Sequence, residues 1–213
     1  MSADDEKRIA AEAAAELVED GMTVGLGTGT TVAYLLDALG KRALDIRCVA
    51  TSVATEEHAA RVGMTVEPFD TVDAFDLAID GADQVDPDFW LVKGGGAAHT
   101  REKVVAASAA RFVVIADARK VVGAIEPPIP VELLAYGLGA TIRRLGDVTL
   151  RDVPRSPDGG VIADYRGAVS SPADVAAFLS STPGVVEHGL FPPSMVSTVL
   201  VGRGSQVEEL RRR

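Results

Sequence analysis

Residues 79–104, IDGADQVDPDFWLVKGGGAAHTREKV, hold the pattern around which the rest of the chain is organised. The run FDLAID (75–80) leads into it, and this run is short, apolar and closed by Asp-Gly, which is typical of a buried strand that ends in a turn. LVKGGG (91–96) has the same form, and EKVVAASAARFVV (102–114) then begins a helix. Charged residues therefore lie where strands end and helices begin, and open α/β sheets bind ligands at such positions.

Four charged residues of this stretch are candidates for chemistry, although each also has a simpler explanation. Asp80 and Asp83 could be turn residues whose side chains bond their own backbone. Glu102 could only stabilise the start of a helix, and Lys93 could be a solvated charge. The three consecutive glycines at 94–96 cost conformational entropy, so they indicate that the backbone must approach something closely.

The composition narrows the class of protein. A chain of 213 residues with 47% hydrophobic residues can form one large domain or two small ones. No apolar run reaches the length of a membrane span, and the start, MSADDEKRIA, is acidic and lacks an apolar signal segment. The one cysteine, Cys48, cannot form an internal disulfide, and His58, His99 and His188 show no metal-ligand spacing. We therefore expect a cytoplasmic protein with no membrane partner and no bound metal.

The charge balance is strongly acidic. The net charge is −10, with 31 acidic residues against 16 Arg and 5 Lys, which argues against nucleic acid as a partner. An anionic substrate would need a local positive pocket. Acidic, lysine-poor surfaces suit a high-salt cytoplasm, because salt screens their self-repulsion, so we infer a halophilic source. The alternative is an ordinary acidic protein from a GC-rich genome.

A second candidate site lies in MTVGLGTGTTVAYLLDALG (22–40). The pattern predicts a strand at 23–26, a turn at 27–31, and a helix at 32–39 that Gly40 ends. A Gly-rich turn before a helix exposes backbone N–H groups at a positive helix end, which favours phosphate. A Walker A motif is absent, and the dinucleotide fingerprint fails because Thr30 stands at its third glycine. A phosphate monoester is the favoured ligand, and a purely structural turn is the alternative.

Further elements alternate through residue 120. We expect a helix at 3–20 that Gly21 ends, a strand at 45–51, a helix at 52–63 with Ser52 and Gly63 at its ends, a strand within 64–70, and a strand at 112–117. This alternation predicts a parallel sheet covered on both faces. Lys7 lies in the first helix and is more simply a surface charge.

After Gly123 the pattern changes. EPPIP (126–130) reads as a linker, and six elements then follow in the order βαββαβ, a ferredoxin-like signature: 131–134, 135–145, 147–153, 161–167, 172–181 and 185–191. Residues 195–204 form a further strand that we expect to return to the first sheet. The prediction is an α/β protein in which a Rossmann-like, mostly parallel domain (1–126 and 195–213) carries an inserted ferredoxin-like domain (127–194). Asp164, Tyr165 and Arg166 read as loop residues, and the ending EELRRR reads as a frayed, solvated tail.

Five segments together resemble one known family. GLGTGTT, IDGADQVD, LVKGGGAAHTREK, IADARK and TPGVVEHGLF, in this order and spacing, resemble ribose-5-phosphate isomerase of the A type, over residues 7–204. The chain departs from the family at Gln84, where Glu is usual, at Thr30, where Ser is common, and at His99, where an apolar residue is usual. None of these departures removes an acid, a base or a phosphate-binding group.

The resemblance implies interconversion of D-ribose 5-phosphate and D-ribulose 5-phosphate in the pentose phosphate pathway, without a cofactor. It implies that Glu102 is the base, and that Asp80, Asp83 and Lys93 hold the sugar and assist ring opening. It also implies a homodimer or a homotetramer, with a phosphosugar as the ligand. The implied substrate-binding residues are Thr28, Gly29, Thr30, Thr31, Asp80, Gly81, Ala82, Asp83, Lys93, Gly94, Gly95, Gly96 and Lys120.

Two other functions remain open at this point. A CoA transferase on a similar sheet would use a Glu as nucleophile, and thioester transfer would reveal it. A non-catalytic sugar-phosphate sensor would usually add an N-terminal DNA-binding domain, whereas only about twenty residues precede the first expected strand here.

Overall fold

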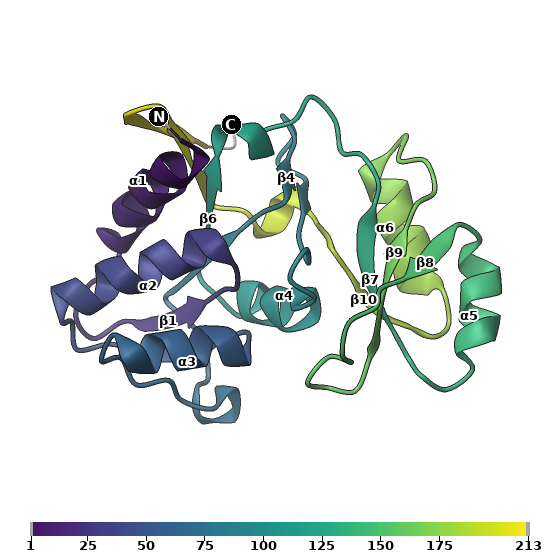
Figure 1. Cartoon of the computed structure of the whole chain (residues 1–213), viewed down its shortest axis with the longest axis horizontal. Helices are drawn as coiled ribbons and strands as arrows, with labels where there is room; N and C mark the ends of the chain where they lie inside the picture. Colours follow the sequence, from purple (N-terminus) through teal and green to yellow (C-terminus); the bar gives the residue numbers. More distant parts are fainter. Residues whose placement is uncertain (1, 212–213) are drawn as a thin grey trace. The chain divides into compact units, whose positions relative to one another are not determined.

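Six strands form the main sheet of the computed structural model, which describes residues 2–211 (Figure 1). Their order across the sheet is β13-β12-β6-β3-β1-β2. All neighbouring pairs are parallel except β12 and β13. The predicted parallel α/β sheet is therefore confirmed, together with the return of the late strand β12 to it. The strands are β1 (Thr23–Leu26), β2 (Arg47–Ala50), β3 (Leu77–Gly81), β6 (Phe112–Asp117), β12 (Thr198–Arg203) and β13 (Gln206–Leu210).

The prediction of a frayed C-terminal tail is wrong as far as Leu210. Residues 206–210 form β13, which pairs antiparallel with β12 and starts with Arg203 opposite Gln206. The side chains of β13 are mostly exposed, so the segment lacks the apolar alternation by which a strand is recognised. Its backbone covers the edge of β12, which would otherwise carry unpaired N–H and C=O groups. The last two residues of the predicted tail, 212–213, lie outside the described residues.

Helices α1 (Ala3–Ala15), α2 (Thr30–Arg42) and α3 (Val53–Arg61) belong to the same unit as the main sheet. The prediction for α1 is five residues too long, because the chain turns after Ala15. The prediction that Gly40 ends α2 is also wrong. The helix continues to Arg42, and a Cβ at position 40 would lie 2.7 Å from Cβ of Val62, so glycine permits close packing there. No helix within residues 2–211 is long and apolar enough to cross a bilayer.

Two local predictions around α3 have different outcomes. Ser52 caps this helix as expected, because its side chain accepts the N–H of Thr55 at 3.2 Å. The strand expected within 64–70 is reduced to a single bridge between Cys48 and Val66, and a short 3-10 helix follows at Phe69–Thr71.

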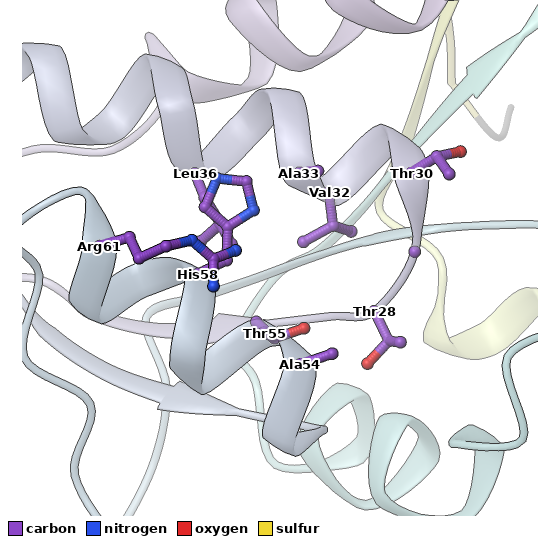
Figure 2. Close-up of a pocket in the computed structure, with 10 residues that line it drawn as sticks. Thr28, Thr30, Val32, Ala33, Leu36, Ala54, Thr55, His58 and Arg61 are labelled. Carbon is purple, nitrogen blue, oxygen red and sulfur yellow. The ribbon is translucent and has the colours of Figure 1, made fainter.

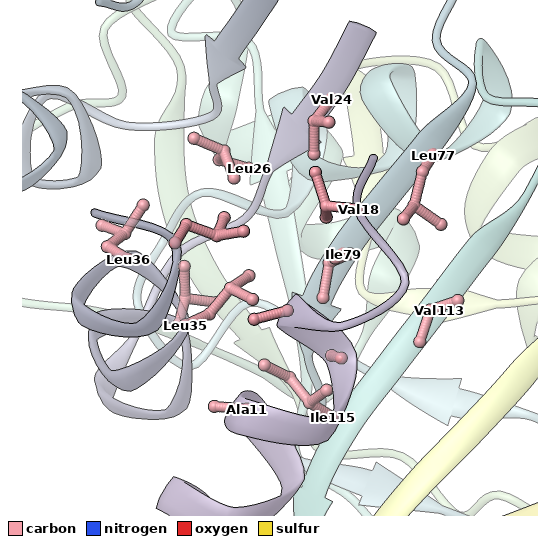
Figure 3. Close-up of a cluster of buried hydrophobic side chains, with 14 of the residues drawn as sticks. Ala11, Val18, Val24, Leu26, Leu35, Leu36, Leu77, Ile79, Val113 and Ile115 are labelled. Carbon is pink, nitrogen blue, oxygen red and sulfur yellow. The ribbon is translucent and has the colours of Figure 1, made fainter. Parts of the chain in front are cut away.

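Small residues let α1 approach its neighbours closely. The helix buries four alanines, at positions 10, 11, 14 and 15, and packs against α2 and β6. Branched side chains from α2 and from the strands fill the remaining space (Figure 3). The strand β6 is buried along its whole length, as expected for a central parallel strand. Parallel pairing places the carboxyl ends of β1, β3 and β6 at one edge of the sheet, and this edge carries Gly27, Asp80 and Asp117.

The second compact unit contains a four-stranded antiparallel sheet, in the order β10-β7-β9-β8. The predicted βαββαβ order is confirmed, and the sheet order is that of a ferredoxin-like unit. Some details differ from prediction. The single strand expected at 185–191 is divided between β10 (Val185–His188) and β11 (Leu190–Phe191), and β11 belongs to a different sheet. The linker ends at Pro128, because β7 begins at Ile129, and Asp164 and Tyr165 belong to β9 rather than to a loop. The elements are β7 (Ile129–Leu133), α5 (Leu138–Leu145), β8 (Val148–Leu150), β9 (Val161–Tyr165), α6 (Pro172–Ser181) and β10 (Val185–His188).

The segment Asp83–Thr100 also packs with this second unit, whose remaining part is Val122–Pro193. It contributes β4 (Gln84–Val85) and β5 (Leu91–Val92), which pair with β11 (Leu190–Phe191) in a small antiparallel sheet. The next segment, Arg101–Val121, belongs to the unit of the main sheet. The predicted helix after the glycine run is α4 (His99–Ala107), which begins three residues earlier than expected.

Candidate active site

The Gly-rich turn lies in the unit of the main sheet, between β1 and α2. A Cβ at Gly27 would lie 1.9 Å from Cγ of Asp80, so a side chain there would collide with that carboxylate. Gly29 has φ 117°, a left-handed value that favours glycine, and it caps α2 without a side-chain hydrogen bond. Helix α2 begins at Thr30, two residues earlier than predicted. The turn therefore presents the first N–H groups of a helix, an arrangement that binds anions.

Asp80 holds this turn in place. Its side chain is 3% exposed, and Oδ1 accepts the backbone N–H groups of Thr28 at 3.0 Å and of Gly81 at 2.7 Å. The simple expectation for Asp80 is a bond to its own local backbone, and the Gly81 contact agrees with it. The Thr28 contact goes further, because it joins the ends of two neighbouring parallel strands.

Two threonines that the sequence analysis did not single out also support the turn. The hydroxyl of Thr51 lies 2.8 Å from that of Thr28, and the hydroxyl of Thr55 donates to the Gly27 carbonyl at 2.7 Å. Both threonines are buried. Their only sequence signal is TSVAT (51–55), where a strand passes into a capped helix.

A cavity of about 340 Å³ lies beside the turn, between α2 and α3 (Figure 2). Thr28 and Thr30 line one end of it, and His58 and Arg61 line the other. His58 Nε2 lies 2.8 Å from Oδ1 of Asp37, so the imidazole is held by a carboxylate. None of the four expected catalytic residues lines this cavity.

Glu102 lies in the first turn of α4 and is 4% exposed. The expected position at a helix start is confirmed. A helix-capping glutamate at a surface would be solvated, so burial sets Glu102 apart from that simple explanation.

Lys120 lies at the end of the short 3-10 helix Ala118–Lys120, which directly follows β6. Asp117 caps this helix. Its Oδ1 accepts the backbone N–H of Arg119 at 3.1 Å and the side-chain Nε–H of Arg119 at 2.9 Å. Burial of Asp117 acts to raise its pKa, but these hydrogen bonds and the nearby positive charges outweigh burial and hold the pKa below its usual value. The segment that carries Lys120 is thus fixed to the end of β6.

Lys93 belongs to the second unit, and the idea that it is a solvated charge is wrong. It is 2% exposed, and its Nζ lies 5.5 Å from the ring centroid of Phe191. Its backbone N–H donates to the carbonyl of Gly189 at 2.8 Å. Burying an ammonium group costs free energy, and proteins keep such buried charges mainly at functional sites. Lys93 is therefore a strong candidate for chemistry.

The glycine run packs against two side chains of its own segment. Gly94 has φ 101°, and a Cβ there would lie 2.7 Å from Nδ1 of His99. A Cβ at Gly95 would lie 2.9 Å from both carboxylate oxygens of Asp83, and the Gly95 N–H donates to Oδ2 at 2.7 Å. Gly95 and Gly96 are exposed. The close approach that the glycines predict is therefore real, and its first partners are His99 and Asp83.

Two further groups hold this segment, and the sequence analysis missed both. Arg151, just after β8, donates to the carbonyls of Gly94 and Gly95. Glu132 in β7 is 2% exposed and accepts the hydroxyls of Thr100 and Ser156, each at 2.5 Å. A charged residue within the apolar run of β7 was a usable signal for Glu132, whereas nothing in the local sequence marks Arg151.

The expected site residues are thus divided between the two units. Within residues 2–211 there is no group of three or more His, Cys, Asp or Glu that could hold a metal ion. Burial raises the pKa of the Cys48 thiol to about 12, which makes it a poor nucleophile. The main-sheet unit holds Thr28, Gly29, Thr30, Thr31, Asp80, Gly81, Ala82, Glu102 and Lys120, and the second unit holds Asp83, Lys93, Gly94, Gly95 and Gly96.

Known proteins resemble this chain along nearly its whole length. The family model of ribose 5-phosphate isomerase A (phosphoriboisomerase A) matches residues 47–206, and that of the DeoR C-terminal sensor domain matches residues 2–65. Ribose-5-phosphate isomerase A of Caulobacter sp. (strain K31) is 47% identical over 206 residues, which cover 90% of this chain and 91% of the relative.

Solved structures agree with this similarity. Ribose 5 phosphate isomerase A from Neisseria gonorrhoeae has a TM-score of 0.94 at 33% identity, over 99% of this chain and 97% of that chain. A D-ribose-5-phosphate isomerase in complex with phospho-erythronic acid has a TM-score of 0.93 at 36% identity, over 100% of both chains. On the family match and on this degree of identity, the chain belongs to the ribose 5-phosphate isomerase A family.

Proposed function

We propose that this chain interconverts D-ribose 5-phosphate and D-ribulose 5-phosphate through an enediolate, as part of the pentose phosphate pathway. Membership of the isomerase family is the observation that carries the proposal. A structural relative binds phospho-erythronic acid, a phosphorylated sugar acid, which agrees with a phosphosugar ligand. The match to a sensor domain covers only residues 2–65 and leaves out the glycine run and Glu102.

Glu102 is the proposed base. An aldose–ketose exchange requires one group that takes a proton from C2 and returns it to C1, and a carboxylate can do both. Glu102 is buried in the first turn of a helix, and the positive end of the helix dipole stabilises a negative charge at that position.

Lys93 and the glycine backbone are the proposed partners of the enediolate oxygens. The intermediate is negatively charged, so a fixed cation and preorganised N–H donors stabilise it. Lys93 is buried, and the backbone at Gly95 and Gly96 is exposed to a ligand. Asp83 is already oriented by the Gly95 N–H, and we assign Asp80 and Asp83 to the sugar hydroxyls and to ring opening.

The phosphate is assigned to the Gly-rich turn. The N–H groups at the start of α2 and the hydroxyls of Thr28, Thr30 and Thr31 are suitable donors, and Lys120 supplies a positive charge. We extend the same proposal to Gly29, Gly81 and Ala82 as neighbouring backbone that contacts the substrate.

We further propose a cytoplasmic homodimer or homotetramer from a halophilic source, with no nucleic-acid partner and no metal. The net charge of −10 and the scarcity of lysine support the salt and nucleic-acid parts of this proposal, and the single buried cysteine supports the location.

A direct assay of ketose formation from ribose 5-phosphate tests the function. In deuterated water, the product ribulose 5-phosphate should carry solvent deuterium at C1. Absence of turnover, together with thioester transfer from an acyl-CoA, would favour a CoA transferase instead, and binding without turnover would favour a sensor.

A further inference from the structure

Arg151 connects the glycine run to the antiparallel sheet of the second unit. Its Nη1 donates to the carbonyl of Gly94 at 2.8 Å and to that of Gly95 at 3.2 Å. The other side of the guanidinium is held by Asp164, through Nε at 3.0 Å and Nη2 at 2.6 Å. The side chains of Arg151 and Asp164 are 17% and 14% exposed, so this pair is largely removed from water. One edge of the Arg151 guanidinium is thus fixed by Asp164, and another N–H is directed at the glycine run.

The strands of the sheet explain why the two residues meet. Arg151 follows β8, and its N–H donates to the carbonyl of Ile162, which continues the pairing of β8 with β9. Asp164 lies two residues further along β9, so its side chain is on the same face as that of Ile162. The pairing of β8 with β9 therefore places Arg151 beside Asp164 independently of the glycine run.

The Gly94–Gly95 peptide is held at both ends. Its carbonyl accepts from Arg151, and its N–H, which belongs to Gly95, donates to Asp83 Oδ2 at 2.7 Å. In the next peptide, the Gly95 carbonyl also faces Arg151. Because a trans peptide directs its C=O and N–H to opposite sides, the N–H of Gly96 points away from Arg151. The residue Gly96 is exposed, which agrees with access of a ligand to this N–H.

We propose that Arg151, oriented by Asp164, is a positioning residue for the isomerisation: it holds the Gly94–Gly96 peptides so that Asp83 and the Gly96 N–H face the substrate. The inference rests on the proposed function and assigns the inserted sheet a part in it. Glycine is the most flexible residue, so three in a row do not keep one conformation without external hydrogen bonds. A cation on the carbonyl side also polarises the peptides and strengthens their N–H groups as donors.

Lysine cannot replace Arg151 in this role. The site requires two parallel donors to Asp164 and a third nitrogen aimed at the carbonyls, and only the planar guanidinium provides both. Arg151→Lys should therefore behave as a partial loss, closer to Arg151→Met than to the wild type.

The test compares Arg151→Met, Arg151→Lys and Asp164→Asn with a matched control, Arg166→Met. Arg166 is exposed, lies near the same strands, and donates to the hydroxyl of Thr149 at 3.1 Å. Turnover of ribose 5-phosphate, thermal midpoint and amide hydrogen exchange of residues 93–100 are measured on each protein. For Arg151→Met we expect a kcat lower by about 10- to 100-fold, since small displacements of positioned groups have effects of this size. KM should change little, exchange at 94–97 should accelerate, and Arg166→Met should match the wild type.

The double variant Arg151→Met/Asp164→Asn should be no slower than Arg151→Met alone, because Asp164 acts through Arg151. A folded Arg151→Met protein with normal kcat and normal exchange overturns the inference. If Arg151→Met does not fold, Asp164→Asn decides in its place, and an unchanged kcat in that variant also overturns it. Failure of the wild type to isomerise ribose 5-phosphate would instead reject the proposed function, and the exchange data would still show whether Arg151 holds the loop.

Discussion

Asp80 and Thr28 are 52 positions apart in the sequence, yet Oδ1 of Asp80 accepts the backbone N–H of Thr28 at 3.0 Å. Asp80 lies near the carboxyl end of β3 and Thr28 follows β1, and these two strands are parallel neighbours. The carboxylate therefore connects the Gly-rich turn to the start of the segment that contains Asp83 and Lys93. This contact requires glycine at position 27, because only a residue without Cβ fits beside Asp80.

This contact predicts that Asp80→Asn and Asp80→Ala differ. Asparagine retains an acceptor oxygen for the N–H groups of Thr28 and Gly81, so the fold should stay intact while kcat falls through the loss of charge. Alanine removes the acceptor from two half-buried N–H donors, and the loss of a buried hydrogen-bond partner costs up to about 1–3 kcal/mol. Thermal midpoint and kcat on the same preparations check both expectations. A fully active Asp80→Asn enzyme would restrict Asp80 to an architectural role.

The Glu102→Gln variant tests whether Glu102 is the catalytic base or only stabilises the start of α4. We expect kcat to fall by about 100-fold or more, within the range of general base catalysis, with KM little changed. Glu56→Gln is the matched control, since Glu56 is an exposed acid in the first turn of α3. In deuterated water the wild type should label C1 of the ketose and Glu102→Gln should not. Near-normal turnover in a folded Glu102→Gln protein would move the assignment to Asp80 or Asp83.

Substitutions in the phosphate region should act on binding. Thr31→Ala and Lys120→Ala should each raise KM and leave kcat nearly unchanged, because contacts to a phosphate remote from the reacting carbons change little on the way to the transition state. Lys41→Ala, an exposed lysine in the last turn of α2, is the control for lost positive charge. Loss of kcat with unchanged KM in both variants contradicts the phosphate assignment.

Isomerase activity should survive exhaustive chelation. The described residues 2–211 bring together no set of three or more typical metal ligands. In the proposed mechanism, the buried Lys93 provides the positive charge that a metal ion would otherwise provide. The measurement is turnover before and after dialysis against EDTA. Loss of turnover that Mg²⁺ or Zn²⁺ restores would make Asp80 and Asp83 metal ligands.

Salt should stabilise the fold. With 31 acidic and 21 basic residues the surface repels itself in dilute buffer, and ions screen this repulsion. We expect the thermal midpoint to rise from low to molar KCl. Sucrose at equal osmolarity is the control for general exclusion from the protein surface. A flat or falling midpoint in KCl leaves codon usage in a GC-rich genome as the better explanation of the composition.

The alternation of apolar runs with glycines and caps was enough to determine the parallel sheet, the inserted βαββαβ unit and the position of Glu102 at a helix start. These features are local, since periodicity, Ser52 and the glycine turns act within a few residues. Errors occurred where tertiary contacts override local preference. Gly40 stays helical because it packs against Val62, and the exposed strand β13 forms because β12 needs an edge partner.

The buried lysine at 93, the Asp80–Thr28 contact and the hold of Arg151 on the glycine run were decided only by the tertiary structure. Their partners are separated by tens of residues, and the side chains that meet have no shared local pattern. Strand pairing brings them together: the parallel pair β1–β3 joins Thr28 to Asp80, and the pair β8–β9 joins Arg151 to Asp164. Sequence periodicity predicts that a strand exists and which of its faces is apolar. The neighbours of a polar group at the end of a strand depend instead on which strands lie side by side in the sheet.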